Sequence, residues 1–142
     1  MTYKLTVNYD TSIESLIEQG KYDWANSDIN ETNFPSEEAG KSKIEVELVG
    51  FDKNISSGDA QGKIIKMGLE PLTLKELLHL GIKYPSLQQE NPIVALGSTW
   101  RNPDGIVRVP YLGRDDSSDR DLDLSWSEGD WPPSWRFVAV RK

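Results

Sequence analysis

Five aspartates lie within ten residues in the segment RDDSSDRDLD, from Arg114 to Asp123. Carboxylate oxygens are the ligands that hard cations such as Ca2+ prefer, and paired carboxylates also hydrolyse glycosidic bonds. The spacing differs from an EF-hand loop, which needs ligands at alternate positions, a central glycine and a final glutamate. The pattern favours a solvated acidic loop. It leaves two alternatives: a Ca2+ site at Asp115–Asp123, or a metal-assisted or carboxylate-based hydrolase.

Nucleophilic catalysis has little support in this chain. A serine–histidine pair would need His79, the only histidine, which lies among leucines in a helical pattern and has no accompanying GxSxG motif. The chain has no cysteine, so disulfides, thiolate zinc sites and cysteine nucleophiles are excluded. We interpret His79 as a structural residue and expect a protein that is not an enzyme and has no resident cofactor.

Aromatic side chains are concentrated in LSWSEGDWPPSWRF, residues 124–137, which holds three of the five tryptophans. Trp126 and Phe137 alternate with leucine or valine as in a strand, so we predict that both belong to the core. Trp131 and Trp135 flank a double proline, which is expected to hold the backbone extended. These two indoles either pack in the core or stack on a sugar, a cation or a partner's side chain.

The N-terminal part of the chain reads as strand, helix, strand, helix. Period-two alternation predicts strands over 3–9 and 43–51. Between them we expect a short helix, capped by Asp10 or Thr11 and ended by Gly20, followed by a polar connection over 21–43. A second helix is expected from Ser56 to about Gly68.

The clearest local signal is TLKELLHLGIKYP, in which Thr73 and Glu76 have the spacing of a capping box and leucines form one apolar stripe. One turn is expected at 86–90 and a β-prone run at 93–100, and the sequence NPDG predicts a hairpin at 102–105. Strands are then predicted over 121–126 and 135–140. Alternation places one set of polar side chains on the same face of the first of these strands: Asp121, Asp123, Ser125 and Ser127.

The composition suits one soluble domain of 142 residues, spanning 1–142. The formal net charge of −7 argues against nucleic acid as a partner, because phosphate binding relies on lysine and arginine. The first residues show no basic segment followed by an apolar run, and no stretch of 18 apolar residues occurs. We therefore expect a cytoplasmic protein with no membrane partner.

The second half of the chain, about residues 68–142, has a recognisable series of motifs: GLEPLTLKELLHLG, NPIVALGSTW, RVPYLG and RDLDLSWSEGDWPPSWRFVAVRK. This series resembles a group of uncharacterised bacterial proteins that share an ending of the RFxAVRK type. The layout is also similar to the C-type-lectin-like fold of formylglycine-generating domains and of the variable proteins of diversity-generating retroelements. Formylglycine generation is a cysteine reaction in those domains, so the absence of cysteine excludes it here.

The resemblance implies an α+β fold in which an N-terminal strand–helix portion, 1–67, supports an irregular, mostly antiparallel, lectin-like portion, 68–142. It also implies noncatalytic binding of a protein or small ligand, and an oligomer interface is the alternative use of such a surface. In the retroelement proteins the displayed residues lie in the last loops and strands. They correspond here to Arg114, Asp116, Arg120, Asp121, Asp123, Ser125, Ser127, Asp130, Trp131, Ser134 and Trp135.

Overall fold

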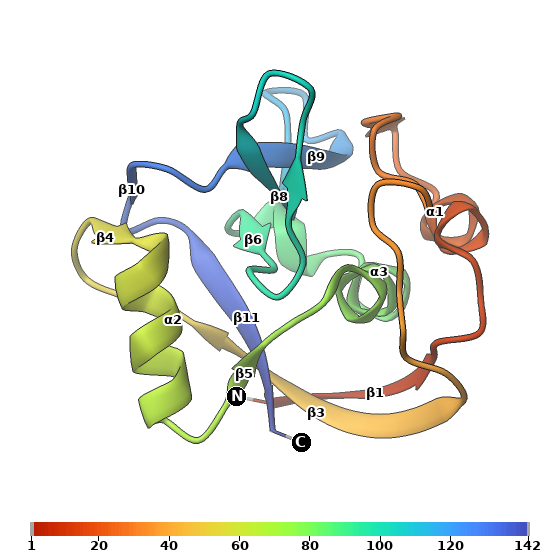
Figure 1. Ribbon diagram of the computed structural model, residues 1–142, viewed down its shortest axis with the longest axis horizontal. Coiled ribbons are helices and arrows are strands. Elements are labelled where there is room, and N and C mark those ends of the chain that lie inside the picture. Colours follow the sequence, from red (N-terminus) through yellow and green to blue (C-terminus); the bar gives the residue numbers. More distant parts are fainter. Residues whose placement is uncertain (1, 142) are drawn as a thin grey trace.

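The computed structural model describes residues 2–141 and has an α+β fold, as predicted (Figure 1). Its helices are α1 (Ile13–Gly20), α2 (Ser57–Lys66), α3 (Leu74–Lys83) and the single 3-10 turn η1 (Leu87–Gln89). One mixed sheet contains β1 (Thr2–Asn8), β2 (Trp24–Ala25), β3 (Lys41–Val49), β5 (Glu70–Pro71), β6 (Ile93–Val94), β7 (Trp100–Arg101), β8 (Val107–Arg114), β9 (Arg120–Trp126) and β11 (Arg136–Arg141). A separate two-stranded ribbon pairs β4 (Ile55–Ser56) with β10 (Asp130–Trp131).

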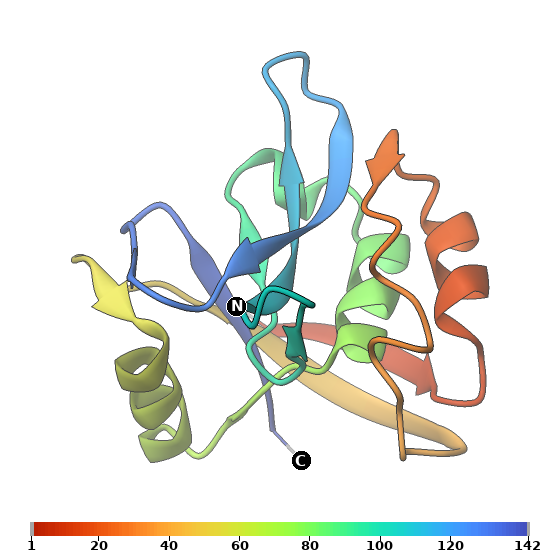
Figure 2. The ribbon, with the colours of Figure 1, turned by 45° about the horizontal axis from the view of Figure 1, so that its top comes forward.

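The main path of the sheet runs β1-β3-β11-β6-β8-β9-β2, and most of its pairs are antiparallel. The last strand, β11, lies between β3 and β6, antiparallel to the first and parallel to the second. The portions 1–67 and 68–142 therefore share one sheet. Figure 2 shows the β8–β9 hairpin rising from the body of the molecule, with its connecting loop at the tip.

The core has two parts, one on each face of β11. Val138 and Val140 join the cluster that contains the buried faces of α1 and α3. Phe137 and Ala139 point the other way and join the cluster that contains α2, β4 and β10. This follows from the two-residue period of a strand, since every residue from 137 to 140 is apolar and can be buried on either side.

The first helix begins later than the sequence suggested. Its N-cap is Ser12, whose Oγ accepts a hydrogen bond from the Ser15 N–H at 3.1 Å, and neither Asp10 nor Thr11 takes this role. Asp10 instead accepts from the Gly40 N–H at 3.1 Å and ties the polar connection to the end of β1. The helix includes Gly20, and the left-handed residue that ends it is Lys21, with φ 52°.

Other elements follow the predicted order with shifted bounds. β3 lies two residues before the predicted 43–51, and the run 93–100 forms only β6 and β7. The backbone leaves β6 because the Gly97 N–H donates to the Leu72 carbonyl at 2.8 Å. The NPDG hairpin is confirmed, with the Asn102 N–H donating to Ile106 O at 2.9 Å and Gly105 at φ 83°. Within residues 2–141, no helix is long and apolar enough to cross a bilayer.

His79 is structural, as predicted, and connects α3 to the end of β1. Its Nδ1 lies 2.7 Å from the Lys75 carbonyl, and its Nε2 accepts a hydrogen bond from the Asn8 N–H at 3.1 Å. A carbonyl can only accept, so Nδ1 carries the hydrogen and the imidazole is neutral. Burial lowers the pKa of His79 below its ordinary value and outweighs the opposing effect of the Lys75 carbonyl.

Because the pKa of His79 is lower in the folded state than in the unfolded chain, its contribution to stability is present above about pH 6.5 and is lost as the pH falls through the folded-state value. We expect the free energy of unfolding to fall between pH 7 and 5. His79→Gln offers an amide oxygen to the Asn8 N–H and should flatten this dependence. Urea denaturation of both proteins across that range measures the difference, and equal slopes would contradict the assignment.

Candidate functional site

The β7–β8–β9 region sets three large side chains in one row. Trp100 is the cross-strand partner of Arg108, and Arg108 is the partner of Trp126. Directly opposed residues share a face of the sheet, so Arg108 lies between the two tryptophans. The next positions on this face of β8 and β9 are Leu124 and its partner Pro110, where the buried core begins.

Trp126 was predicted to be a core residue, and this is wrong: its side chain is 61% exposed. The predicted alternation is correct, because Leu122 and Leu124 on the same face are buried. Trp126 is the last residue of β9, and its neighbour in the sheet is an arginine. The face that is covered by helices at Leu122 is open at Trp126, so the indole projects into solvent.

Trp131 and Trp135 are brought together by a turn, contrary to the expectation that the double proline is extended. The Trp135 N–H donates to the Pro132 carbonyl at 3.1 Å, and the two indoles lie 4.7 Å apart between ring centroids. Trp131 is only 4% exposed, whereas Trp135 is half-buried against Tyr111. Trp131 therefore belongs to the core, and Trp135 reaches the surface with one side.

The position of Trp131 is also set by hydrogen bonds. Its Nε1–H donates to Ser57 Oγ at 2.8 Å, and Ser57 Oγ in turn donates to the Ser127 carbonyl at 2.7 Å. The pairing of β10 with β4 holds the backbone on the same side. A single serine at the start of α2 thus joins the tryptophan to Ser127, the residue after β9.

These residues enclose a concavity of about 410 Å³ between the end of β9 and β10, which we call the aromatic groove. Trp131, Trp135 and the exposed Trp126, the last residue of β9, are all among its lining residues. Two exposed carboxylates also line it. The full lining is Arg108, Leu124, Ser125, Trp126, Glu128, Asp130, Trp131, Pro132 and Trp135.

The edge of β9 beside the groove is closed by side chains. β2 pairs with β9 only at Asp121 and Leu122, so beyond that point the described chain supplies no strand on this side. Leu124 has its N–H bonded to Asp123 Oδ1 at 2.7 Å and its carbonyl bonded to Arg108 Nη2 at 2.6 Å. These bonds occupy the backbone groups that an added strand would need.

Four of the residues that the resemblance implied for ligand binding line the groove: Ser125, Asp130, Trp131 and Trp135. Ser127 and Ser134 lie just outside it, and their carbonyls accept from Ser57 and Asn91. Asp123 is half-buried behind Leu124 and accepts from Asn26 Nδ2 at 3.0 Å. The structure therefore gathers about half of the implied set around one concavity.

The other members of the implied set, Arg114, Asp116, Arg120 and Asp121, lie toward the opposite end of the hairpin. The acidic loop there is organised by its own backbone, since Asp115 Oδ1 accepts from the Ser117 and Asp119 N–H groups. The carboxylates of Asp115 and Asp23 raise the pKa of Asp119 by repulsion. Within residues 2–141, no group of three His, Cys, Asp or Glu side chains is arranged to hold a metal ion.

Arg120 has a structural role that the sequence did not indicate. Its guanidinium donates to the carbonyls of Gly20 at 2.5 Å, Gly81 at 3.0 Å and Pro85 at 3.1 Å, and lies 4.6 Å from the centre of the Tyr22 ring. Gly20 and Gly81 are in the last turns of α1 and α3, where the helix dipoles are negative. Arg120 therefore fastens two helix ends to β9.

This role predicts a large effect on stability. Arg120→Met keeps the apolar stem but leaves the carbonyls of Gly20, Gly81 and Pro85 without this donor, so the free energy of unfolding should fall by about 2–4 kcal/mol. Arg114→Met is the matched control, because Arg114 is exposed and bonds only Ser118 Oγ. The control should change stability by about 0.5 kcal/mol or less. Equal effects in urea denaturation would contradict the structural role.

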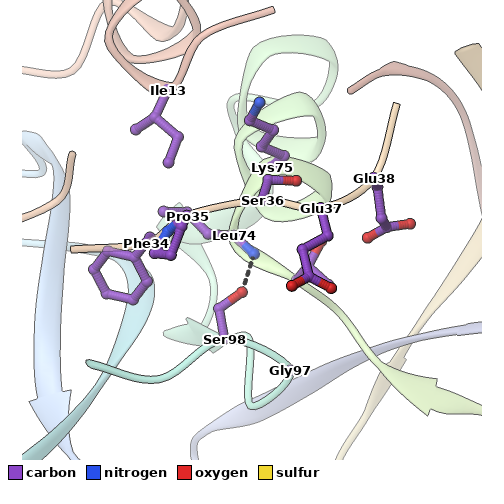
Figure 3. A pocket seen from close by; sticks show the side chains of 11 residues that line it. Ile13, Phe34, Pro35, Ser36, Glu37, Glu38, Leu74, Lys75, Gly97 and Ser98 are labelled. Carbon is purple, nitrogen blue, oxygen red and sulfur yellow. Dashed lines mark hydrogen bonds between the residues drawn. The ribbon is translucent and has the colours of Figure 1, made fainter. Parts of the chain in front are cut away.

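A second concavity, of about 300 Å³, lies where residues 34–38 cross the N-terminus of α3 (Figure 3). Two polar groups at this helix end are occupied by bonds within the fold. The Leu74 N–H donates to Ser98 Oγ at 2.8 Å, and Glu76 accepts from the Thr73 N–H at 2.9 Å, as the predicted capping box requires. Glu37 and Glu38 stand beside this helix end, so an anion is disfavoured there.

The buried wall behind this second concavity joins α3 to β1. Tyr9 donates its hydroxyl to Glu76 Oε2 at 2.5 Å, and Lys75 Nζ donates to the Tyr9 carbonyl at 2.8 Å and pairs with Glu31 at 3.4 Å. Burial, together with the Glu76 carboxylate, raises the pKa of Tyr9. We assign these groups to packing of α3 against the end of β1 and against Glu31.

Sequence reasoning missed Arg108 and Glu128 as groove residues and assigned Trp126 to the core. The hairpin register could have placed Arg108 opposite Trp126, because the turn at 102–105 and the loop at 115–119 determine which residues of β7, β8 and β9 face each other. One feature of the sequence did indicate that the Trp126 side chain is exposed. Trp126 comes directly before SEGD, residues 127–130, and therefore lies at the end of its strand.

Comparisons with protein-family models, curated proteins and solved structures find no match to this chain. The resemblance to lectin-like domains therefore stays a prediction. The case for a function rests on the geometry of the aromatic groove.

The different environments of the tryptophans predict different effects on stability. Trp126→Ala removes an exposed indole and should change the free energy of unfolding by about 0.5 kcal/mol or less. Trp131→Ala removes a buried indole and leaves Ser57 without its donor, so it should cost about 3–5 kcal/mol. Chemical denaturation followed by far-UV circular dichroism measures both. A large fall in the free energy of unfolding for Trp126→Ala would show that this residue is part of the core and would contradict its exposed position.

Proposed function

We propose that this protein is a noncatalytic recognition module that binds a protein or other ligand through the aromatic groove. The observation that carries the proposal is the Trp126 indole, 61% exposed at the edge of a concavity that also contains two carboxylates and an arginine. Tryptophan and arginine are the residues most enriched at binding hot spots. Packing of the hairpin does not require an indole here, because the buried members of its face end at Leu124.

The groove is better suited to binding than to catalysis. His79 has both ring nitrogens engaged with backbone groups on α3 and β1, and no histidine or cysteine lines the groove. The groove residues include Ser125, but no described base is hydrogen-bonded to it, as an activated nucleophile would need. The acidic loop, the other candidate for hydrolysis, lies toward the far end of the hairpin.

Rigid construction supports the same proposal. Trp131 is held by Ser57 and by the β4–β10 ribbon, and the edge of β9 is closed at Leu124. Because these residues are already held in place, the protein loses less conformational entropy when a ligand binds in the groove. The closed edge disfavours addition of a peptide strand, so a ligand is recognised through its side chains or functional groups.

Selection of ligands tests the proposal. A random dodecapeptide library and an immobilised glycan panel are screened against the protein, with Trp126→Ala and Trp24→Ala as a matched pair, because Trp24 is also exposed (51%) but lies on β2 outside the groove. Binders should be lost with Trp126→Ala and retained with Trp24→Ala. Binders that bind both variants equally well would overturn the proposal.

A further inference from the structure

We propose that the aromatic groove recognises an arginine side chain of a partner polypeptide, with its guanidinium stacked on Trp126 and hydrogen-bonded to Glu128 or Asp130. This inference rests on the proposed function and specifies the chemistry of the ligand. Two features of the groove carry it, the open indole face and the sign of the charges on the rim, and the carboxylate acceptors match the donors of a guanidinium.

The open indole is the platform. The ring of tryptophan has the most negative face among aromatic side chains and attracts cations, and planar guanidinium groups stack on it well. Trp126 is the groove indole with most of its surface in solvent, since Trp131 is buried and Trp135 is half-buried. A ligand can therefore cover the indole of Trp126 without displacing any part of the fold.

The charge of the rim is negative. Among the nine groove residues, the carboxylates of Glu128 and Asp130 outnumber the one guanidinium, Arg108. Both acids are exposed and flank Gly129, which turns the chain at φ 82°. The whole chain carries a formal charge of −7, so long-range attraction also favours a basic partner.

Two of the hydrogen-bond donors that line the groove are already engaged within the fold. The Trp131 N–H is already donated to Ser57, and Arg108 donates Nη2 to the Leu124 carbonyl while its Nε is buried within the sheet. An anionic ligand would have the remaining Arg108 nitrogens, the Ser125 hydroxyl and the indole N–H groups of Trp126 and Trp135 as donors, but it would face two carboxylates. A guanidinium brings five N–H donors in a planar fork, which matches carboxylate acceptors.

The probe for the test is acetyl-Arg-Arg-Arg-amide, titrated into 15N-labelled protein. The indole N–H signal of Trp126, assigned by its absence in Trp126→Leu, should shift in a saturable way, while that of Trp24 should not. Raising the salt concentration from about 50 to 500 mM should weaken binding by screening the carboxylates. Acetyl-Lys-Lys-Lys-amide should bind less tightly, because an ammonium cannot stack as a plane.

Matched variants separate the cation contact from simple apolar burial. Trp126→Leu keeps an apolar side chain but removes the π face, and should weaken triarginine binding by about two- to five-fold. Trp24→Leu is its control and should have no effect. The double variant Glu128→Gln, Asp130→Asn should also bind triarginine more weakly than the unmodified protein. Its control is the double variant Glu18→Gln, Asp116→Asn, which makes the same charge change on exposed residues outside the groove and should have a small effect.

Three further probes distinguish the failure of this inference from the failure of the proposed function: acetyl-Glu-Glu-Glu-amide, maltohexaose, and the protein itself at rising concentration. If one of them shifts the Trp126 signal and triarginine does not, the groove binds a ligand of another class and the arginine inference is overturned. If no probe shifts Trp126 and the library screen also yields no groove-dependent binder, both are overturned. An affinity for triarginine that is unchanged in the Glu128→Gln, Asp130→Asn variant would also contradict the inference.

Discussion

The structure depends on the insertion of its last strand into the middle of the sheet. β11 pairs with β3 on one side and β6 on the other, and residues 137–140 are buried on both faces. Its odd-numbered side chains complete the cluster under α2, and its even-numbered ones complete the cluster under α1 and α3. Neither core is closed until β11 is in place, so the two portions of the chain fold as parts of one sheet.

The aromatic groove follows from this arrangement. Phe137 lies edge-on to Trp131 at 6.0 Å, and Trp131 packs against Trp135, which packs against Tyr111 of β8. The groove floor is thus an extension of the core, and only the end of β9 goes beyond it. The same hairpin is fastened at its opposite end by Arg120 to α1 and α3. Held at both ends, the hairpin keeps Trp126 and Arg108 in fixed positions.

Much of the fold could be predicted because its signals are local. The Thr73–Glu76 spacing, the NPDG turn and the alternation in β1, β3 and β9 each report a bond or face within a few residues. The place of β11 between β3 and β6 could not be predicted, because a strand whose residues 137–140 are all apolar is compatible with any central position. Arg120 was assigned to the implied ligand-binding set, and its structural role was missed because its partners, Gly20 and Gly81, are 100 and 39 residues away in the chain.

For the site as well, local sequence predicted which face a side chain lies on, but not which distant residues cover it. Alternation correctly placed Trp126 on the face of Leu122 and Leu124, but burial depends on what covers a face, and the covering helices stop short of the strand end. For Trp131 and Trp135 the sequence left open whether each side chain is buried or exposed. Trp131 is buried and donates its N–H to Ser57, whereas Trp135 packs against Tyr111 and is only half-buried. Such contacts are a property of the assembled fold.

The closed edge of β9 has a further consequence, for self-association. An open strand edge beside exposed aromatic surface is the usual starting point for intermolecular β-pairing. Asp123 and Arg108 occupy the backbone groups of Leu124 from both sides, so two copies of the chain cannot extend their sheets through this position. The molecule therefore displays a large indole at the end of a strand whose edge is blocked at Leu124 against pairing with a second copy.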